Sequence, residues 1–154
     1  MIWNTIWIEN ATKLDATWIA QMSRDKIEYG LKWSWTPERV LQSINASNTT
    51  VAKASIRTKN VGFGIMTYRK EKANLNLLAV NSTKQRSGIG KKILESLEKT
   101  AFDQGIEDFY VQIRETNIDA QKFYKTFGYE MIDRNKTYYQ QKEPGVIFYK
   151  YCPS

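Results

Sequence analysis

The first third of the chain alternates apolar and polar residues and then shifts to helical spacing. Residues 2–8 follow the two-residue period of a strand. A helix is expected over residues 15–29, with Gly30 ending it. Thr36 and Pro37 predict the start of a second, shorter helix, because threonine favours the N-cap and proline the first helical position.

Three strand-like runs occupy the middle of the chain. They cover residues 50–56, 61–68 and 74–80, and each is rich in β-branched or other apolar residues. The dipeptide Lys59-Asn60 and the polar residues 69–72 are expected to form the turns between them. Connections this short predict an antiparallel meander.

The second half alternates helix and strand before it ends in two strands. Helical spacing covers residues 89–101 and 117–127, and a strand is expected between them at 109–113. Residues 129–132 and 146–151 are expected to form a closing hairpin. The pattern predicts a single α/β layer structure.

Composition is consistent with one soluble domain over residues 1–154. Hydrophobic residues make up 42% of the chain, but no run approaches the roughly 20 apolar residues that cross a bilayer. We therefore expect a cytoplasmic protein without a membrane segment, either a monomer or a homodimer. With no histidine and a single cysteine, Cys152, the chain cannot form an internal disulfide, and most zinc sites and imidazole catalysis are excluded. No metal is expected.

The net charge of +7, from 23 basic and 16 acidic residues, favours anionic partners. A phosphorylated cofactor and nucleic acid both fit this charge. The basic residues are spread along the sequence, which argues against dedicated nucleic-acid binding.

A glycine pair lies where the run at 74–80 gives way to a helix. The segment reads Gln85-Arg86-Ser87-Gly88-Ile89-Gly90, followed by Lys91 and Lys92. A helix N-terminus carries unpaired N–H groups and positive potential, and glycines let a pyrophosphate approach them closely. An ordinary strand-to-helix turn is the alternative interpretation.

Two nucleotide-binding motifs are excluded at this position. A Walker loop needs a hydroxyl residue after its lysine, but Lys91 is followed by Lys92. The dinucleotide fingerprint needs a third glycine, and Ile93 occupies that position.

Together with a second motif, this segment resembles the GNAT superfamily of acyl-CoA-dependent N-acetyltransferases. The first match is Leu77-Leu78-Ala79-Val80 followed by Gln85-x-x-Gly88-x-Gly90. The second is Arg114-x-x-Asn117-x-x-Ala120-x-x-Phe123-Tyr124-x-x-x-Gly128-Tyr129. Within the superfamily the chain is most similar to the ribosomal-protein-alanine N-acetyltransferase type. The resemblance implies a mixed, mostly antiparallel sheet of six to seven strands, splayed at the cofactor site and flanked by about four helices.

The resemblance also implies a cofactor site for acetyl-CoA. The backbone from Gln85 to Gly90 would hold the pyrophosphate, and Leu78 to Val80 would pair with the pantetheine arm as if it were an added strand. Asn117 would bond that arm, and Tyr124 would lie near the thioester sulfur. The residues implied to contact the cofactor are Leu78, Ala79, Val80, Gln85, Arg86, Ser87, Gly88, Ile89, Gly90, Lys91, Asn117, Ala120, Phe123 and Tyr124.

Tyr124 and Val80 are the candidate catalytic residues. Attack of an amine on a thioester produces an oxyanion and then a thiolate. A phenol, whose ordinary pKa is about 10, can protonate the thiolate, and the Val80 N–H is a candidate oxyanion donor. The alternative interpretations are a core aromatic residue for Tyr124 and a plain helix-start residue for Asn117.

The general base and the acceptor are not identified by the sequence. Asn74 and Gln112 occupy positions where relatives often carry a carboxylate, and neither accepts a proton at neutral pH. The glutamates considered as bases, each expected at the surface, are Glu28, Glu115 and Glu130. The residues expected to bind the acceptor amine are Arg24, Glu28, Trp33 and Trp35.

The leading hypothesis is acetyl transfer to a primary amine by direct attack in a ternary complex. The alternatives are an acyl-CoA-binding regulatory or interaction module without catalysis, and a basic protein associated with nucleic acid.

Overall fold

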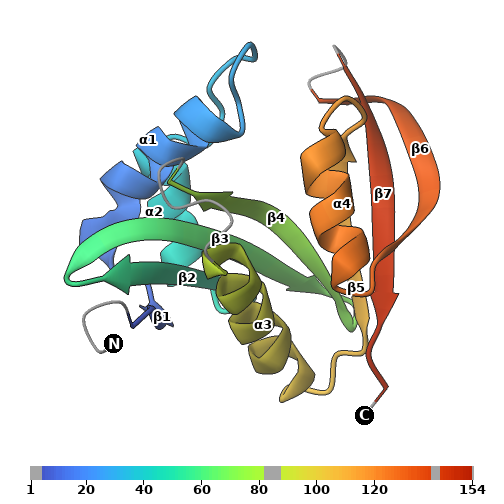
Figure 1. Cartoon of the computed structure of the whole chain (residues 1–154). Coiled ribbons are helices and arrows are strands. Elements are labelled where there is room, and N and C mark those ends of the chain that lie inside the picture. Colours follow the sequence, from blue (N-terminus) through green and yellow to red (C-terminus); the bar gives the residue numbers. More distant parts are fainter. Residues whose placement is uncertain (1–4, 82–87, 140–142, 154) are drawn as a thin grey trace.

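The protein is built on a seven-stranded sheet with the strand order β1-β2-β3-β4-β5-β7-β6 (Figure 1). The computed structural model describes residues 5–81, 88–139 and 143–153, the side chains of 136–139 excepted. The strands are β1 (Trp7–Asn10), β2 (Thr49–Ile56), β3 (Lys59–Arg69), β4 (Lys72–Val80), β5 (Asp108–Arg114), β6 (Glu130–Tyr139) and β7 (Glu143–Tyr151). The helices are η2 (Lys13–Asp15), α1 (Ala16–Lys26), α2 (Pro37–Asn45), α3 (Ile89–Phe102) and α4 (Ile118–Thr126). The expected meander, the two later helices and the closing hairpin are confirmed, although β7 lies between β5 and β6.

The sheet opens between β4 and β5, its one parallel pair of strands. These strands pair only from Lys72 opposite Asp108 to Leu75 opposite Val111, and they diverge beyond that point. A bulge begins at the same place, because Ile65 and Met66 of β3 face Leu77 and Leu75 and leave Asn76 as the extra residue of β4. The predicted splay is therefore confirmed.

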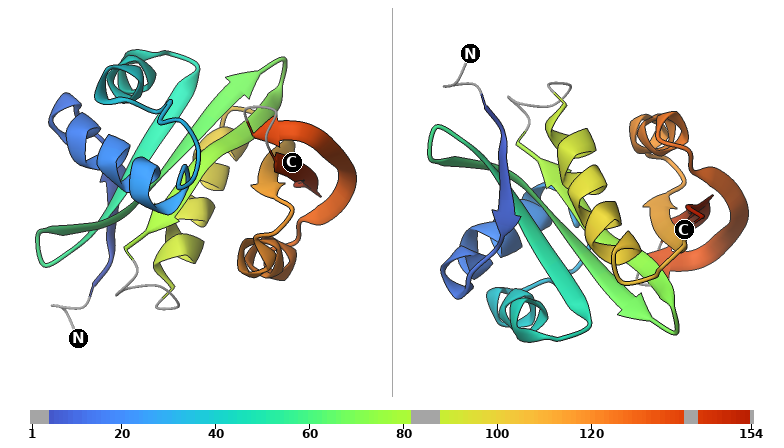
Figure 2. Two further views of the ribbon diagram at one scale, coloured as in Figure 1. Left: turned by 90° about the horizontal axis from the view of Figure 1, so that it is seen from above. Right: turned by 90° about the horizontal axis from the view of Figure 1, so that it is seen from below.

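Helices cover both faces of the sheet. α1 and α2 pack on one face, and α3 and α4 on the other (Figure 2). Gly64 of β3 lets α3 pack closely, since a Cβ at this position would lie 2.7 Å from Leu97 Cδ1. This packing places the N-terminus of α3 at the opening between β4 and β5. None of the helices in the described ranges is long and apolar enough to cross a bilayer.

The turns of the meander differ from the prediction. Lys59-Asn60 was expected to be the first turn, but both residues belong to β3, and the turn is Arg57-Thr58. Both of its residues have positive φ, 53° and 69°, as do Lys70 and Glu71 in the next turn. Two-residue hairpin turns of this kind usually contain Asn or Gly. Neither turn does, so the sequence carried no signal for them.

The first helix is shorter than expected. It ends at Lys26 rather than near Tyr29, and residues 27–36 form a loop, called here the α1–α2 loop. Glu28 is buried and collects hydrogen bonds from that loop, so its expected surface position is wrong. The predicted start of α2 is confirmed, because the Thr36 hydroxyl accepts from the Arg39 N–H at 3.4 Å.

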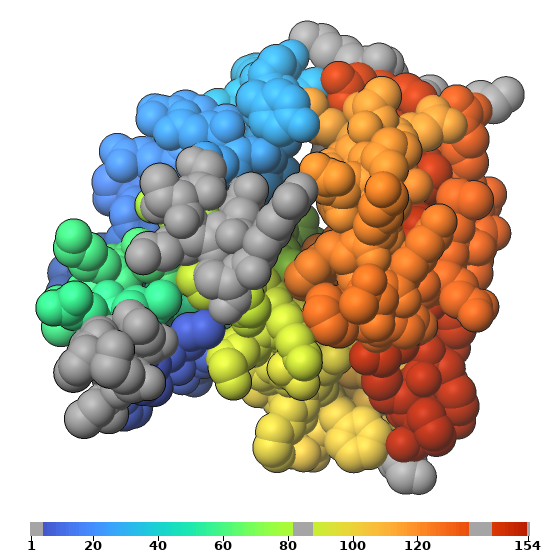
Figure 3. Space-filling model, in the orientation of Figure 1, coloured from blue at the N-terminus to red at the C-terminus, as the bar shows by residue number. Residues whose placement is uncertain are grey.

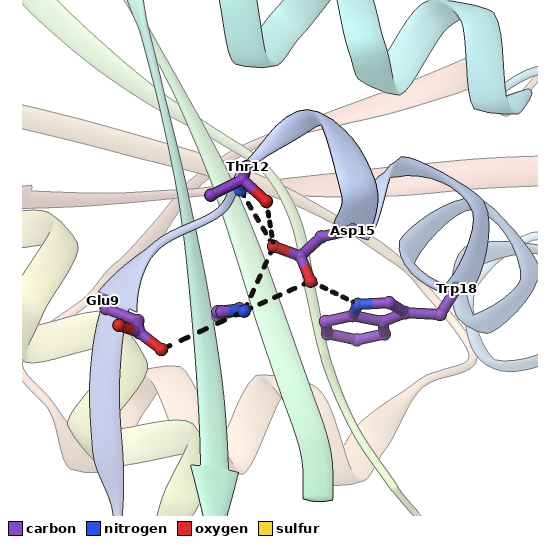
Figure 4. Close-up of polar contacts among 5 residues, drawn as sticks. Glu9, Thr12, Asp15 and Trp18 are labelled. Atoms are coloured by element: carbon purple, nitrogen blue, oxygen red, sulfur yellow. Dashed lines mark hydrogen bonds and ion pairs between the residues drawn. The ribbon is translucent and has the colours of Figure 1, made fainter. Parts of the chain in front are cut away.

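Asp15 joins the start of α1 to the sheet (Figure 4). Its Oδ2 accepts the Thr12 N–H at 2.8 Å, while Oδ1 accepts Trp18 Nε1 at 2.9 Å and Lys53 Nζ at 3.2 Å. Burial raises the pKa of this carboxyl, but the bonds from Thr12, Trp18 and Lys53 outweigh it and hold the pKa below its ordinary value.

We expect Asp15→Asn to destabilise the fold by about 2 kcal/mol at pH 7, because a charged acceptor is lost from a buried network. A depressed folded-state pKa contributes stability that is present above the unfolded value of 3.8 and disappears as the pH falls through the folded pKa. The gap between wild type and variant should therefore narrow below pH 4 in urea unfolding. Glu9→Gln, which alters the exposed partner of Lys53 at 3.9 Å, is the control and should change stability by less than about 0.5 kcal/mol. A gap that does not change with pH would contradict the prediction.

Candidate active site

A cavity of about 730 Å³ occupies the opening between β4 and β5. The space-filling view shows the same face hollowed between the light blue end of α1 and the orange surface of α4 (Figure 3). Its walls come from the end of α1, β4, the start of α3, β5 and α4. The described residues that line it outside the predicted set include Lys26, Ile27, Tyr29, Asn76, Gln112, Arg114, Asp119, Lys122 and Phe127.

Most of the predicted cofactor residues lie in this wall. They are Leu78, Ala79, Val80, Gly88, Gly90, Lys91, Asn117, Ala120, Phe123 and Tyr124. Ile89 is an exception, because its side chain is buried in the core beneath α3. Gln85, Arg86 and Ser87 lie outside the described residues.

The two glycines meet different demands at the start of α3. Gly88 is the N-cap and has φ +86°, a conformation that favours glycine. Gly90 faces α4, since a Cβ there would lie 3.3 Å from the Phe123 ring. The first helical bond runs from the Lys92 N–H to the Gly88 carbonyl at 3.1 Å, which leaves the three preceding N–H groups without an acceptor inside the helix. With Lys91 beside them, they form a site suited to an anion.

Asn117 caps α4 and also lines the cavity. Its Oδ1 accepts the Ala120 N–H at 3.0 Å. The helix-start interpretation is therefore confirmed, and the side chain remains in the wall of the cavity where the resemblance placed it.

Tyr124 combines core packing with access to the cavity. Its ring packs edge-on against Phe123 and Tyr129, at centroid distances of 5.0 and 5.5 Å, and only 6% of the residue is exposed. Tyr129 is different, because its hydroxyl donates to Glu98 at 2.7 Å and does not line the cavity. Burial, followed by the charge of Glu98, raises the pKa of Tyr129 far above its ordinary value. The two stacked tyrosines thus separate a cavity hydroxyl from a structural one.

The four residues expected to bind the acceptor do not line the cavity. Glu28 accepts from Ser23 Oγ at 2.9 Å and from the Ser34 N–H and Oγ, each at 2.7 Å. Trp33 bonds the Ala20 carbonyl at 3.2 Å and Arg24 lies 5.3 Å from its ring, while Trp35 stacks under Arg39 at 3.7 Å. These side chains hold the α1–α2 loop together. Lys26, Ile27 and Tyr29 of the same segment contribute to the wall instead.

The glutamates considered as bases are also engaged or remote. Glu115 forms two bonds to Arg134, at 2.6 and 2.8 Å, and this contact lowers the pKa of its carboxyl. Glu130 is exposed on β6 and does not line the cavity. Gln112 lines the cavity, whereas Asn74 does not. Among the described lining residues the one carboxylate is Asp119, in the first turn of α4, which sequence reasoning missed.

Arg114 and Tyr29 were also missed as cavity residues. Arg114 opens the second sequence motif, so a signal for it existed. Tyr29 was assigned to the interior of a helix, and its position became clear only once α1 ended at Lys26.

Comparison with known proteins agrees with this geometry. Residues 19–148 match the acetyltransferase (GNAT) domain. The alanine N-acetyltransferase of ribosomal protein bS18 from Haemophilus ducreyi is 33% identical over 79 residues, 51% of this chain and 54% of that protein. The enzyme of the same name from Salmonella typhimurium is 24% identical over 147 residues, 94% and 95% of the two chains. The match thus spans about half the length of the Haemophilus relative.

Solved structures share the whole architecture. The ribosomal-protein-S18-alanine N-acetyltransferase of Escherichia coli superposes with a TM-score of 0.80 at 20% identity, covering 97% of this chain and 96% of that one. A PaiA N-acetyltransferase from Thermoplasma acidophilum, solved with coenzyme A, gives 0.82 at 19% identity, with 96% and 99% covered. With its splayed sheet, glycine-started α3 and a domain match over most of its length, the chain belongs to the GNAT acetyltransferase domain family.

Proposed function

We propose that the protein transfers an acetyl group from acetyl-CoA to a primary amine by direct attack in a ternary complex. The observation that carries the proposal is the cavity at the β4–β5 opening, which has the N-terminus of α3 at one end and Tyr124 in its wall. Its volume of about 730 Å³ is typical of a small-molecule site.

The walls of the cavity offer a place for each part of acetyl-CoA. The N–H groups at the start of α3, with Lys91, suit the pyrophosphate. Beyond Leu75, β4 is separated from β5, so an extended pantetheine arm can lie along Leu78 to Val80 as an added strand. The thioester would then lie near Tyr124, which protonates the departing thiolate while the Val80 N–H stabilises the oxyanion.

Direct transfer fits the residues of the cavity better than an acyl-enzyme does. The described lining residues include no cysteine or serine, and Cys152 lies at the other end of β7 from the cavity-lining Arg114 and its partner Gly145. The amine would therefore attack the thioester itself, approaching from the side of Tyr29 and Lys26.

The acceptor belongs to the same proposal. Relatives named for alanine N-acetylation make a peptide with N-terminal alanine the first acceptor to test. A lysine side-chain amine, spermidine and an aryl amine complete a panel of four acceptors. A module that binds acetyl-CoA without catalysis is the second candidate, and it is favoured by the scarcity of carboxylates in the described cavity wall. Release of CoA with any amine of the panel would decide between the two.

Acetyl-CoA and CoA should raise the melting temperature, whereas NAD and ATP should change it little. At 100 times a micromolar-range Kd the stabilisation is about 2.7 kcal/mol, or about 5–10 °C for a chain of this size. Gly88→Glu should abolish the shift, because it places a side chain and a negative charge where the pyrophosphate binds.

Gly105→Glu is the matched control for this variant. Gly105 has φ +88° and open space around its Cα, as Gly88 does, but it follows the far end of α3 and lies outside the cavity wall. Both variants add the same backbone strain and charge, yet only Gly88→Glu should lose the acetyl-CoA shift. An unchanged shift in Gly88→Glu would show that the cofactor binds elsewhere.

A further inference from the structure

Arg114 connects the two walls of the cavity. It is the last residue of β5, and its Nη2 donates to the carbonyls of Ile27, at 2.7 Å, and Tyr29, at 2.9 Å. Its guanidinium also lies 4.3 Å from the centroid of the Tyr29 ring. These partners are 87 and 85 residues away in sequence, and the arginine is only 6% exposed. The contact is therefore a buried joint between two distant parts of the chain.

The α1–α2 loop has its own internal support but needs an external one to fix its distance from β5. Glu28 gathers Ser23 of α1 and Ser34 of the loop, so it shapes the loop against its own helix. Arg114 instead bonds the carbonyls on either side of Glu28, and these point toward β5. Glu28 therefore shapes the loop, and Arg114 sets where the loop lies across the cavity.

Arg114 itself is held on the cofactor side of the cavity. It pairs with Gly145 of β7 in the sheet, and its Nη1 lies 3.5 Å from Glu143 Oε2. Glu143, Arg114 and the Tyr29 carbonyl thus form a continuous connection from β7 to the α1–α2 loop. Ile27, Tyr29 and Arg114 all line the cavity, so a shift of this joint would change the width of the cavity.

We propose that Arg114 is a positioning residue that sets the acceptor wall of the cavity at the distance required for attack on the thioester. This inference rests on the proposed function, in which the acceptor approaches past Tyr29. A planar guanidinium bonds two carbonyls and stacks on a ring at the same time, whereas a lysine ammonium provides neither the fork nor the stacking face. The arrangement therefore requires arginine and not simply a positive charge.

Arg114→Lys tests the geometry while it keeps the charge next to Glu143. The kcat/KM for the best acceptor of the panel should fall about 10- to 100-fold, since displacement of a substrate wall by about 1 Å has effects of this size. The Kd for acetyl-CoA, measured by titration calorimetry, should change by less than about twofold, because the proposed cofactor contacts lie on β4, α3 and α4. Hydrogen exchange of residues 27–36 should become faster.

Arg134→Lys is the matched control. Arg134 forms a bidentate pair with Glu115 on the neighbouring strand and lies outside the cavity wall. Its replacement should leave the acceptor kcat/KM and loop exchange unchanged. Arg114→Met, which also removes the charge, should lower acceptor kcat/KM further, and the loss should be partly recovered by lysine. If the methionine variant does not fold, the lysine variant alone decides.

Three results would overturn the inference. One is an unchanged acceptor kcat/KM in Arg114→Lys, and another is a loss of acetyl-CoA affinity as large as the loss in kcat/KM. The third is loop exchange equal to that of the wild type. Failure of the proposed function has a separate signature, since the wild-type protein would then release no CoA with any amine of the panel, and both proposals would fall together.

Discussion

Tyr124→Phe should lower turnover about 10²- to 10⁴-fold while acetyl-CoA binding survives. The size of the effect is that of losing a general acid from a transition state in which charge develops on sulfur. The variant keeps the edge-on packing against Phe123 and Tyr129, at 5.0 and 5.5 Å, because only the hydroxyl is removed. The measurements are single-turnover acetyl transfer and the acetyl-CoA thermal shift. Equal turnover in the two proteins would return Tyr124 to a purely structural role.

Tyr129→Phe provides the control for this experiment. It removes a hydroxyl 2.7 Å from Glu98, beside the same ring stack but outside the cavity wall. Stability should fall by about 1–3 kcal/mol, because the Glu98 carboxylate loses a buried donor. Turnover per folded molecule should not change. A loss of turnover in both variants would mean that the packing of the stack, and not a hydroxyl, supports the reaction.

Local signals in the sequence predicted the cofactor half of the site well. Gly88, Gly90 and Asn117 each lie at the end of a helix, where a single residue type fits the backbone, and those preferences are visible without a structure. The edge at Leu78 to Val80 followed from the resemblance, and the bulge at Asn76 with the short β4–β5 pairing provides its physical basis.

The acceptor half could not be predicted in the same way. Whether Glu28 faces solvent depends on donors at Ser23 and Ser34, which reach it only once the α1–α2 loop has folded back. Arg114 contacts Tyr29 across 85 positions of sequence, and no local pattern encodes such a pair. Tryptophans at 33 and 35 suggested an amine site by their chemistry, but tertiary packing used them to anchor the loop.

The acidic limb of the kcat/KM profile should follow the ammonium pKa of the acceptor. Glu28 is already occupied by four donor groups, from Ser23, Ser34 and Trp35, and Glu115 by Arg134, while Gln112 takes up no proton at neutral pH. If no protein group removes the amine proton, only acceptor that is already neutral attacks. The limb should then move from about 8 for a peptide α-amine to about 10.4 for a lysine-type amine. A weakly basic aryl amine should show no such limb near neutral pH.

A protein base would instead hold the limb at one pH for every acceptor. Asp119 is the carboxylate of the described cavity wall, so Asp119→Asn is the variant most able to remove such a limb. Glu28→Gln, Glu115→Gln and Glu130→Gln complete the set. Glu28→Gln is interpreted together with loop exchange, because that side chain also holds Ser34 at 2.7 Å. A limb that stays at one pH for the peptide and the lysine-type amine, and that disappears in Asp119→Asn without a change in acetyl-CoA affinity, would contradict the absence of a base and identify Asp119 as the group that accepts the proton.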